Sequence, residues 1–195
     1  MDIIKIMLVE DDPFWQKHLA ADLNAEADLE VVVTVSNKEK AIESINKISV
    51  DVVLLDINLT EANLDGLELA KEIKRVSAAK VIMLTSLEEK DIIVEAFCQG
   101  ADNFIYKSSY KDIVSAVRAA YQNRISIHSD VSQILTKELV KERKLRILTP
   151  TERELYDLQL KGMSKSQIAN SLFKSVSTVK NQIRKIKEKL TSNLD

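Results

Sequence analysis

At 195 residues the chain is long enough for one large domain or two small ones, and its 45% hydrophobic and 30% charged residues are ordinary for a soluble globular protein. The sequence lacks a run of about eighteen apolar residues and the layout of a signal peptide, so we expect no membrane span and no membrane partner. Cys98 is the only cysteine, which excludes an internal disulfide and fits a cytoplasmic protein.

Charge is distributed unevenly along the chain. Residues 1–122 contain 13 basic and 22 acidic residues, a net charge of −9, whereas residues 123–195 contain 15 basic and 8 acidic residues, a net charge of +7. An acidic first part and a basic second part suggest two modules, the second suited to a polyanion. Lysines that only keep the second part soluble would give the same balance, so charge alone leaves both interpretations open.

Apolar runs typical of buried strands alternate with amphipathic stretches typical of helices over the first 122 residues. We expect strands over residues 3–9, 30–35, 51–55, 80–84 and 102–106. We expect helices over residues 13–25, 38–47, 66–75, 88–99 and 110–122. This alternation predicts an α/β fold, a doubly wound five-stranded parallel sheet with helices on both faces. No phosphate-binding glycine signature follows the first strand, which disfavours a dinucleotide site.

Several residues at these boundaries have the chemistry that starts or ends a helix. Pro13 suits the first turn of a helix, Asn37 can cap the next one, and Gly100 suits a helix C-terminus. We expect Trp15 to be a partly buried anchor on the first helix.

Reactive or charged side chains stand at the ends of four predicted strands. They are Glu10 and Asp11, Asp56, Thr85 and Lys107. Because the carboxyl ends of parallel strands meet at one edge of a sheet, we expect these side chains to share a crevice. Carboxylates suit Mg²⁺, an aspartate can accept a phosphoryl group, and an ammonium group can neutralise its oxygens. The alternative is that they are unrelated strand-end residues that face solvent.

Residues 3–122 resemble a bacterial response-regulator receiver domain, which has a flavodoxin-like fold. The matching motifs are Leu8-Val9-Glu10-Asp11-Asp12, Leu54-Leu55-Asp56, Asp65-Gly66, Met83-Leu84-Thr85-Ser86 and Tyr106-Lys107. Two features depart from the family: Ser108 stands where many members have proline, and the loop from Asp56 to Gly66 looks longer than usual.

The resemblance implies a role for each matching residue. Asp56 corresponds to the phospho-acceptor, and Glu10 and Asp11 correspond to the acidic pair that binds Mg²⁺. Asn58 would add its backbone carbonyl to the metal site. The remaining matches are Thr85 and Tyr106, the hydroxyl and aromatic switch residues, and Lys107, the phosphate-binding lysine.

Residues 123–147 are expected to form a largely helical linker. Apolar residues near helical spacing predict a helix over residues 129–144; they are Val131, Ile134, Leu135, Leu139 and Val140. The next helix should begin at Thr149 and Pro150, because Glu152 completes a capping box with Thr149. Gly162 should end it, and Ser164 should cap a short helix that follows.

The predicted last helix, over residues 176–190, is amphipathic. Its apolar stripe is Val176, Val179, Ile183, Ile186 and Leu190. Its opposite face carries Thr178, Lys180, Asn181, Arg184, Lys185 and Lys187. Two short helices around a tight turn, the second basic on its outer face, are typical of a DNA-binding helix-turn-helix. A small helical bundle with a lysine-rich surface is the alternative.

Residues 148–190 resemble a LuxR-type helix-turn-helix, so we expect a small all-α DNA-binding domain over residues 148–195. The match rests on residues 148–154 (Leu-Thr-Pro-Thr-Glu-Arg-Glu), 161–164, 167–169 and 177–182. The resemblance implies that Lys180, Asn181 and Arg184 enter the DNA groove, where such side chains read base edges. Phosphate contacts are expected from Lys165, Ser177, Thr178 and Lys185.

Together these features indicate a two-component response regulator of the LuxR/NarL type with an N-terminal receiver over residues 1–122. A sensor histidine kinase would phosphorylate Asp56 with Mg²⁺ present, and homodimerisation or release of the helix-turn-helix would allow DNA binding. The family usually continues into a further helix, whereas only residues 191–195 follow here, so a module that docks a protein stays an alternative. A hydrolytic enzyme of the aspartyl-phosphate phosphatase kind is disfavoured, because no second domain large enough for a substrate pocket is visible.

Overall fold

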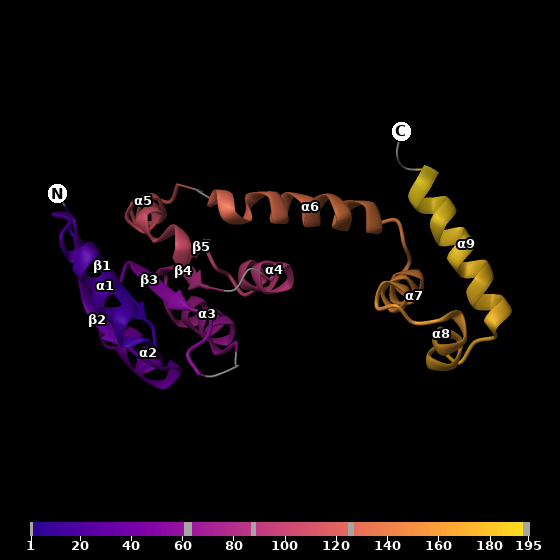
Figure 1. The fold of residues 1–195 in the computed structure, drawn as a ribbon, viewed down its shortest axis with the longest axis horizontal. Coiled ribbons are helices and arrows are strands. Elements are labelled where there is room, and N and C mark those ends of the chain that lie inside the picture. The colour runs from indigo at the N-terminus through magenta and orange to yellow at the C-terminus, as the bar shows by residue number, and fades with distance from the viewer. Residues whose placement is uncertain (1, 61–63, 87–88, 125–126, 193–195) are drawn as a thin grey trace. The chain divides into compact units, whose positions relative to one another are not determined.

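The computed structural model describes residues 2–60, 64–86, 89–124 and 127–192, and Figure 1 shows their helices and strands. The chain divides into two compact units, Met1–Leu135 and Thr136–Asp195. The predicted domain limits at residues 122 and 148 stay predictions. In the part of the chain that the structure describes, no helix is long and apolar enough to cross a membrane.

The first unit contains a five-stranded parallel sheet in the order β2-β1-β3-β4-β5, counted over its described residues. Its strands are β1 (Ile4–Val9), β2 (Leu29–Val35), β3 (Val52–Asp56), β4 (Lys80–Thr85) and β5 (Asn103–Tyr106). The central strand β3 is buried along its whole length, as its unbroken aliphatic sequence predicts. This architecture confirms the predicted doubly wound α/β fold.

Helices cover both faces of the sheet. They are α1 (Pro13–Asn24), α2 (Lys38–Ile45), α3 (Asp65–Val76), α4 (Lys90–Cys98) and α5 (Ile113–Tyr121). One hydrophobic cluster lies under α2, α3 and α4, and a second lies under α1 and α5. The helix signals in the sequence act as expected, since Pro13 begins α1, Asn37 caps α2 and Gly100 follows α4 with φ +99°.

Most boundaries in the first unit differ from prediction by one or two residues, and two of the differences lie beside Asp56 or Lys107. The strand expected over residues 51–55 runs instead over Val52–Asp56, so Asp56 belongs to β3 and is paired with Leu84. The helix expected over residues 110–122 begins only at Ile113, because a 3₁₀ helix, η1 (Lys107–Asp112), precedes it. Ser109 in η1 has non-helical backbone angles, φ −100° and ψ 26°, which interrupt a continuous α-helix.

Helix α6 (Ser129–Leu145) confirms the helix expected over residues 129–144, and its first turns belong to the first unit. Val131 is fully buried in the hydrophobic cluster under α4, and Ile134 and Leu135 pack against the same cluster. Leu139 and Val140 are 71% and 48% exposed, so only part of the apolar pattern is buried.

The second unit is helical, with α7 (Pro150–Leu160), α8 (Lys165–Ser171) and α9 (Val176–Ser192). Both predicted caps are present, a capping box at Thr149 and a second one at Ser164. Buried aliphatic residues from α7, α8 and α9 form its core, which includes Leu155, Ile168, Val179, Ile183 and Ile186. Val176 is 38% exposed, so the buried stripe of α9 begins one turn later than expected.

Candidate functional site

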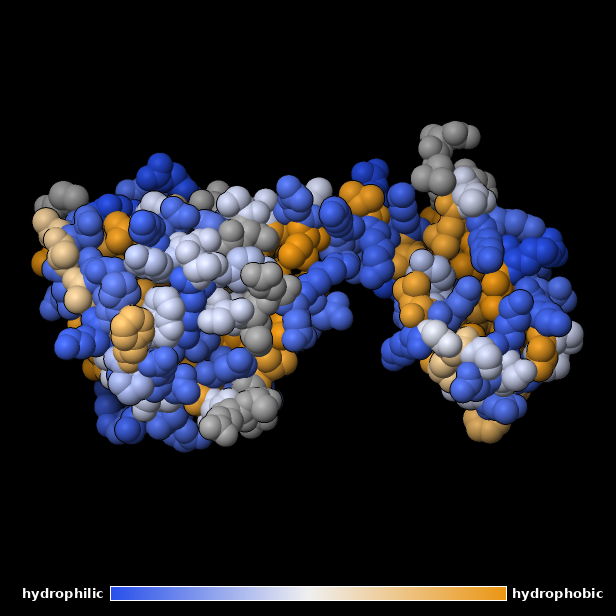
Figure 2. All heavy atoms as spheres, in the orientation of Figure 1, coloured by the Kyte–Doolittle hydropathy of each residue, from blue (hydrophilic) through white to orange (hydrophobic). Residues whose placement is uncertain are grey.

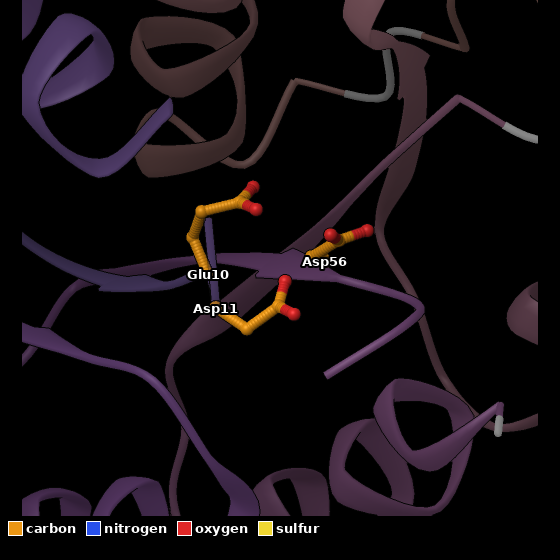
Figure 3. A group of neighbouring side chains, drawn as sticks. All are labelled: Glu10, Asp11 and Asp56. Carbon is orange, nitrogen blue, oxygen red and sulfur yellow. The ribbon is translucent and has the colours of Figure 1, made fainter. Parts of the chain in front are cut away.

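Three carboxylates meet at the carboxyl edge of the sheet. Glu10 and Asp11 directly follow β1, and Asp56 ends the neighbouring strand β3. One oxygen from each lies within 4.8 Å of the others, and Figure 3 shows the three side chains converging on one space. Glu10 and Asp56 are buried, whereas Asp11 is exposed, so the cluster opens to solvent on the Asp11 side.

The chain also approaches Asp56 closely from α3. A Cβ atom on Gly66 would lie 2.2 Å from the backbone oxygen of Asp56 and 2.7 Å from Cα of Ile57. The amide of Gly66 donates a hydrogen bond to the Ile57 oxygen at 2.9 Å. Only glycine fits this approach, so the Asp65-Gly66 motif fixes the start of α3 against the carboxyl end of β3.

Lys107, the first residue after β5, carries the cation of the site. Its Nζ donates a hydrogen bond to Oδ2 of Asp56 at 2.8 Å and lies 2.7 Å from Oε2 of Glu10. The Lys107 side chain is 8% exposed, so both contacts are made almost without water. One ammonium group against two buried carboxylates leaves an excess of negative charge, and Asp11 adds to it.

Burial raises the pKa of Glu10 to about 7, and the Asp56 carboxylate beside it adds to the rise. Burial alone would lower the pKa of Lys107, but its hydrogen bonds to Asp56 and Glu10 outweigh that effect and raise it. Lys107 is therefore a permanent cation at neutral pH, while Glu10 is poised between its two protonation states. A divalent cation beside the three carboxylates would favour the ionised form of Glu10.

The remaining predicted residues lie around this cluster. Thr85 ends β4, is fully buried and pairs in register with Tyr106, the partly exposed last residue of β5. The backbone N–H of Asn58 donates a hydrogen bond to Oδ1 of Asp56 at 3.4 Å, so this peptide lies beside the Asp56 carboxylate. The Lys107–Ser108 peptide is trans, as are all described peptide bonds. Part of the Asp56–Gly66 loop, residues 61–63, lies outside the described residues.

One neighbour of the site was not identified from the sequence. The Trp15 ring is partly buried, as expected, but it also lies over Lys107, with Nζ 5.5 Å from the ring centroid. The sequence signal is an aromatic residue in the first turn of the helix that follows the acidic pair. That signal identifies neither the lysine nor the contact, because the two residues are far apart in the chain.

The second candidate surface is on α8 and α9, where every residue predicted to contact DNA is exposed. These residues are Lys165, Ser177, Thr178, Lys180, Asn181, Arg184 and Lys185. Lys165, Lys180, Arg184 and Lys187 line a cleft of about 380 Å³. Asn181 and Lys185 lie about 100° further round α9, on a neighbouring stripe. Figure 2 shows hydrophilic side chains along the outer side of α9 and hydrophobic ones on the side towards α7.

Hydroxyl groups gather at the start of α9. Ser175, just before α9, has its Oγ 2.8 Å from the hydroxyl oxygens of Ser177 and Thr178 and accepts a hydrogen bond from the Thr178 amide. Hydroxyl groups at a helix N-terminus suit a phosphate. Arg184 Nη1 lies 2.7 Å from Glu188, but both side chains are largely exposed, so this ion pair is weak and can be exchanged for DNA.

Comparison with known proteins gives two family matches. The response regulator receiver domain matches residues 6–118, and the luxR family of bacterial regulatory proteins matches residues 146–193. The response regulator protein VraR of Staphylococcus epidermidis is 30% identical over 190 residues, which cover 96% of this chain and 90% of VraR. The transcriptional regulatory protein LnrK of Bacillus subtilis is 29% identical over 202 residues, covering 96% and 91% of the two chains.

Solved structures of response regulators have the same fold. A structure of the Salmonella typhimurium response regulator RcsB has a TM-score of 0.74 at 22% identity, covering 98% of this chain and 95% of that one. The structure of an RcsB–DNA complex has a TM-score of 0.70 at 22% identity, covering 97% and 92%.

The raised pKa of Glu10 predicts a pH dependence of stability in the absence of divalent cations. The folded protein holds a proton on Glu10 that the unfolded chain releases near its ordinary value of 4.5. This contribution to the free energy of unfolding is therefore full below pH 4.5 and is lost as the pH rises through about 7. In Glu10→Gln, which cannot ionise, we expect the free energy of unfolding to gain on the order of 1–3 kcal/mol relative to the parent between pH 5 and pH 8.

Urea unfolding in a chelating buffer at pH 5, 6, 7 and 8 measures this difference. Glu30→Gln, at an exposed position of β2, controls for the loss of one negative charge. If the free energy of unfolding changed with pH in the same way in the parent and in Glu10→Gln, the raised pKa of Glu10 would be contradicted.

Proposed function

Because this chain belongs to the response regulators, with a receiver domain followed by a LuxR-type DNA-binding domain, we propose that phosphorylation of Asp56 switches its binding to DNA. One observation carries the proposal: Asp56 is buried among carboxylates at the end of the central strand, and Lys107 donates a hydrogen bond to it at 2.8 Å. The protein is a regulator, and the reaction serves as its switch.

Asp56 would act as the nucleophile in phosphoryl transfer. A carboxylate oxygen of Asp56 attacks phosphorus, a new O–P bond forms, and the bond from phosphorus to the donor breaks, with its electron pair leaving on the donor. The donor would be a phosphohistidine of a sensor histidine kinase or a small acyl phosphate. Lys107 is already in place to bind an oxygen of the incoming group, so little rearrangement of the cation is needed.

The residues present fit a Mg²⁺ ion. Glu10, Asp11 and Asp56 would hold it, and the Asn58 carbonyl would add a fourth oxygen. When bound, the ion would neutralise charge on the phosphoryl oxygens. The fit rests on the excess of carboxylate over ammonium in the cluster and on the raised pKa of Glu10, which a cation would reverse.

We expect the change at Asp56 to be transmitted through the ends of β4 and β5. We expect the Thr85 hydroxyl to move towards the phosphoryl group and Tyr106 to follow it inward, because the two residues pair across adjacent strands. Tyr106 packs against the same hydrophobic cluster as Ile134 and Leu135 of α6. A movement of Tyr106 would therefore change the surface on which the first turns of α6 rest.

Polar contacts also tie the start of α6 to this region. The His128 amide donates a hydrogen bond to Oδ1 of Asn103, the first residue of β5, at 3.1 Å. Nε2 of His128 lies 3.0 Å from Oδ2 of Asp112 in η1. Together with the buried Val131, these contacts support the proposal that α6 connects the switch to the DNA-binding domain. Release of the start of α6 from the first unit, or homodimerisation through the surface that this release exposes, would then permit DNA binding.

The exposed face of α9 would read DNA. Lys180, Asn181 and Arg184 have the chemistry for base edges, and the basic and hydroxyl residues around them suit phosphates. Two copies of the chain on paired half-sites would double this surface. A chain that binds DNA in this way would act in the cytoplasm.

We first expect the parent protein, incubated with Mg²⁺ and acetyl phosphate, to gain the mass of one phosphoryl group. Asp56→Asn, which keeps the size of the side chain but not its nucleophilic carboxylate, should gain none. Intact-mass spectrometry with and without a chelator measures both effects. An equal adduct on Asp56→Asn would place the acceptor elsewhere.

We also expect Lys180→Ala and Arg184→Ala, made singly, to weaken DNA binding by at least about tenfold, because each removes a groove contact. Lys161→Ala removes one exposed positive charge just after α7 and is the matched control, with a much smaller effect. Fluorescence anisotropy with a duplex that the parent selects from a random library gives the affinities. Unchanged affinity in both variants would favour a module that docks a protein.

Finally, we expect Val131→Ala to raise the DNA affinity of the unphosphorylated protein severalfold. The lost methyl groups weaken the packing of α6 against the first unit by about 1 kcal/mol. Leu139→Ala, at a largely exposed position of the same helix, should leave the affinity unchanged. Anisotropy on the same duplex compares the two variants. Weaker binding by Val131→Ala would mean that the α6 contact supports DNA binding.

A further inference from the structure

The aromatic residue Trp15 lies over the cation of the phospho-acceptor site. The Nζ atom of Lys107 is 5.5 Å from the centroid of the Trp15 ring, within the range of a cation–π interaction. The Lys107 side chain is 8% exposed, so water competes little with the ring. Tryptophan is the aromatic side chain that attracts a cation most strongly, and a dry site strengthens the attraction.

The ring is fixed by the elements on both sides of the site. Asp12 accepts a hydrogen bond from the Phe14 amide at 2.8 Å and so sets the first turn of α1, where Trp15 lies. The ring packs edge-on against Tyr110 of η1, with ring centroids 6.3 Å apart. Because Tyr110 follows Lys107 in the same short helix, Trp15 connects α1 to the segment that carries the lysine.

The contact has a chemical consequence if Asp56 is phosphorylated. In the structure the Lys107 ammonium is held by Asp56 and Glu10 on one side and faces the Trp15 ring on another. During phosphoryl transfer the ammonium must exchange a carboxylate oxygen for an oxygen of the incoming group. The ring takes no part in that exchange, so it can hold the ammonium at the site throughout.

We propose that Trp15 is a positioning residue for Lys107 in phosphoryl transfer to Asp56, acting through the face of its ring. The inference rests on the proposed function and deepens it. Under this inference a side chain of α1 also takes part in phosphoryl transfer.

Trp15 is the only tryptophan of the chain, so biosynthetic incorporation of fluorinated tryptophans alters this ring alone. Fluorine withdraws electron density from the ring face with little change in size. Monofluoro-, difluoro- and trifluorotryptophan proteins would be given acetyl phosphate and saturating Mg²⁺. Asp56 then gains the phosphoryl group, and acetate leaves with the electron pair of the broken P–O bond. We expect the phosphorylation rate constant to fall stepwise with fluorination, by about three- to tenfold in the trifluoro protein.

Substitutions separate the ring face from simple packing. Trp15→Leu keeps an apolar side chain without a ring and should lose at least as much rate as the trifluoro protein, whereas Trp15→Phe should restore part of it. Phe14→Leu, at a neighbouring aromatic residue that is 67% exposed, should keep the parent rate. Urea midpoints of all proteins monitor folding.

The outcomes are distinct. A parent that is phosphorylated at Asp56 while the fluorinated series keeps one constant rate would overturn the role of Trp15 and leave the proposed function intact. A series that is flat while Trp15→Leu and Trp15→Phe lose rate equally would assign the residue to packing, which also overturns the proposal. A parent that gains no phosphoryl group would overturn the proposed function itself.

Discussion

The structure depends on one buried cation, the ammonium group of Lys107, held between Asp56 and Glu10. Buried carboxylates this close repel each other, and each loses the water that would stabilise its charge. Lys107 offsets part of this cost but leaves the cluster short of positive charge, as the raised pKa of Glu10 indicates. A parallel sheet suits this arrangement, because strands far apart in the sequence deliver their end residues to one edge. An incoming phosphoryl group or a divalent cation would enter a site in which the negative charges of the carboxylates already exceed the positive charge of Lys107.

The same arrangement suggests how the proposed switch would reach the second unit. Asp56 and Thr85 end adjacent strands, and Tyr106 ends the next one, so a change at Asp56 would be passed across the sheet one strand at a time. Beyond Tyr106 the hydrophobic cluster includes Val131 of α6. Since α6 continues along the chain into the second unit, the proposed switch would act on the DNA-binding helices through this helix.

The sequence predicted the sheet and the carboxylate cluster because strand-end residues of complementary chemistry recur with the strand pattern. It could not predict that η1 delays the start of α5, since that depends on the backbone angles of Ser109. The apolar residues of α6 gave no indication that Val131 is buried and Leu139 exposed, because burial there depends on tertiary packing. The contact between Trp15 and Lys107 was missed for the same reason, as it joins two elements that are far apart in the sequence.

The most direct test of the switch is amide hydrogen exchange of α6 in the full chain, with and without phosphorylation in Mg²⁺. The account predicts faster exchange over residues 129–135 in the phosphorylated protein, while the interior of α9 keeps its rate. Asp56→Asn treated in the same way should show no change. Identical exchange over residues 129–135 in the phosphorylated and unphosphorylated parent would contradict the account, because α6 would then not respond to the charge at Asp56.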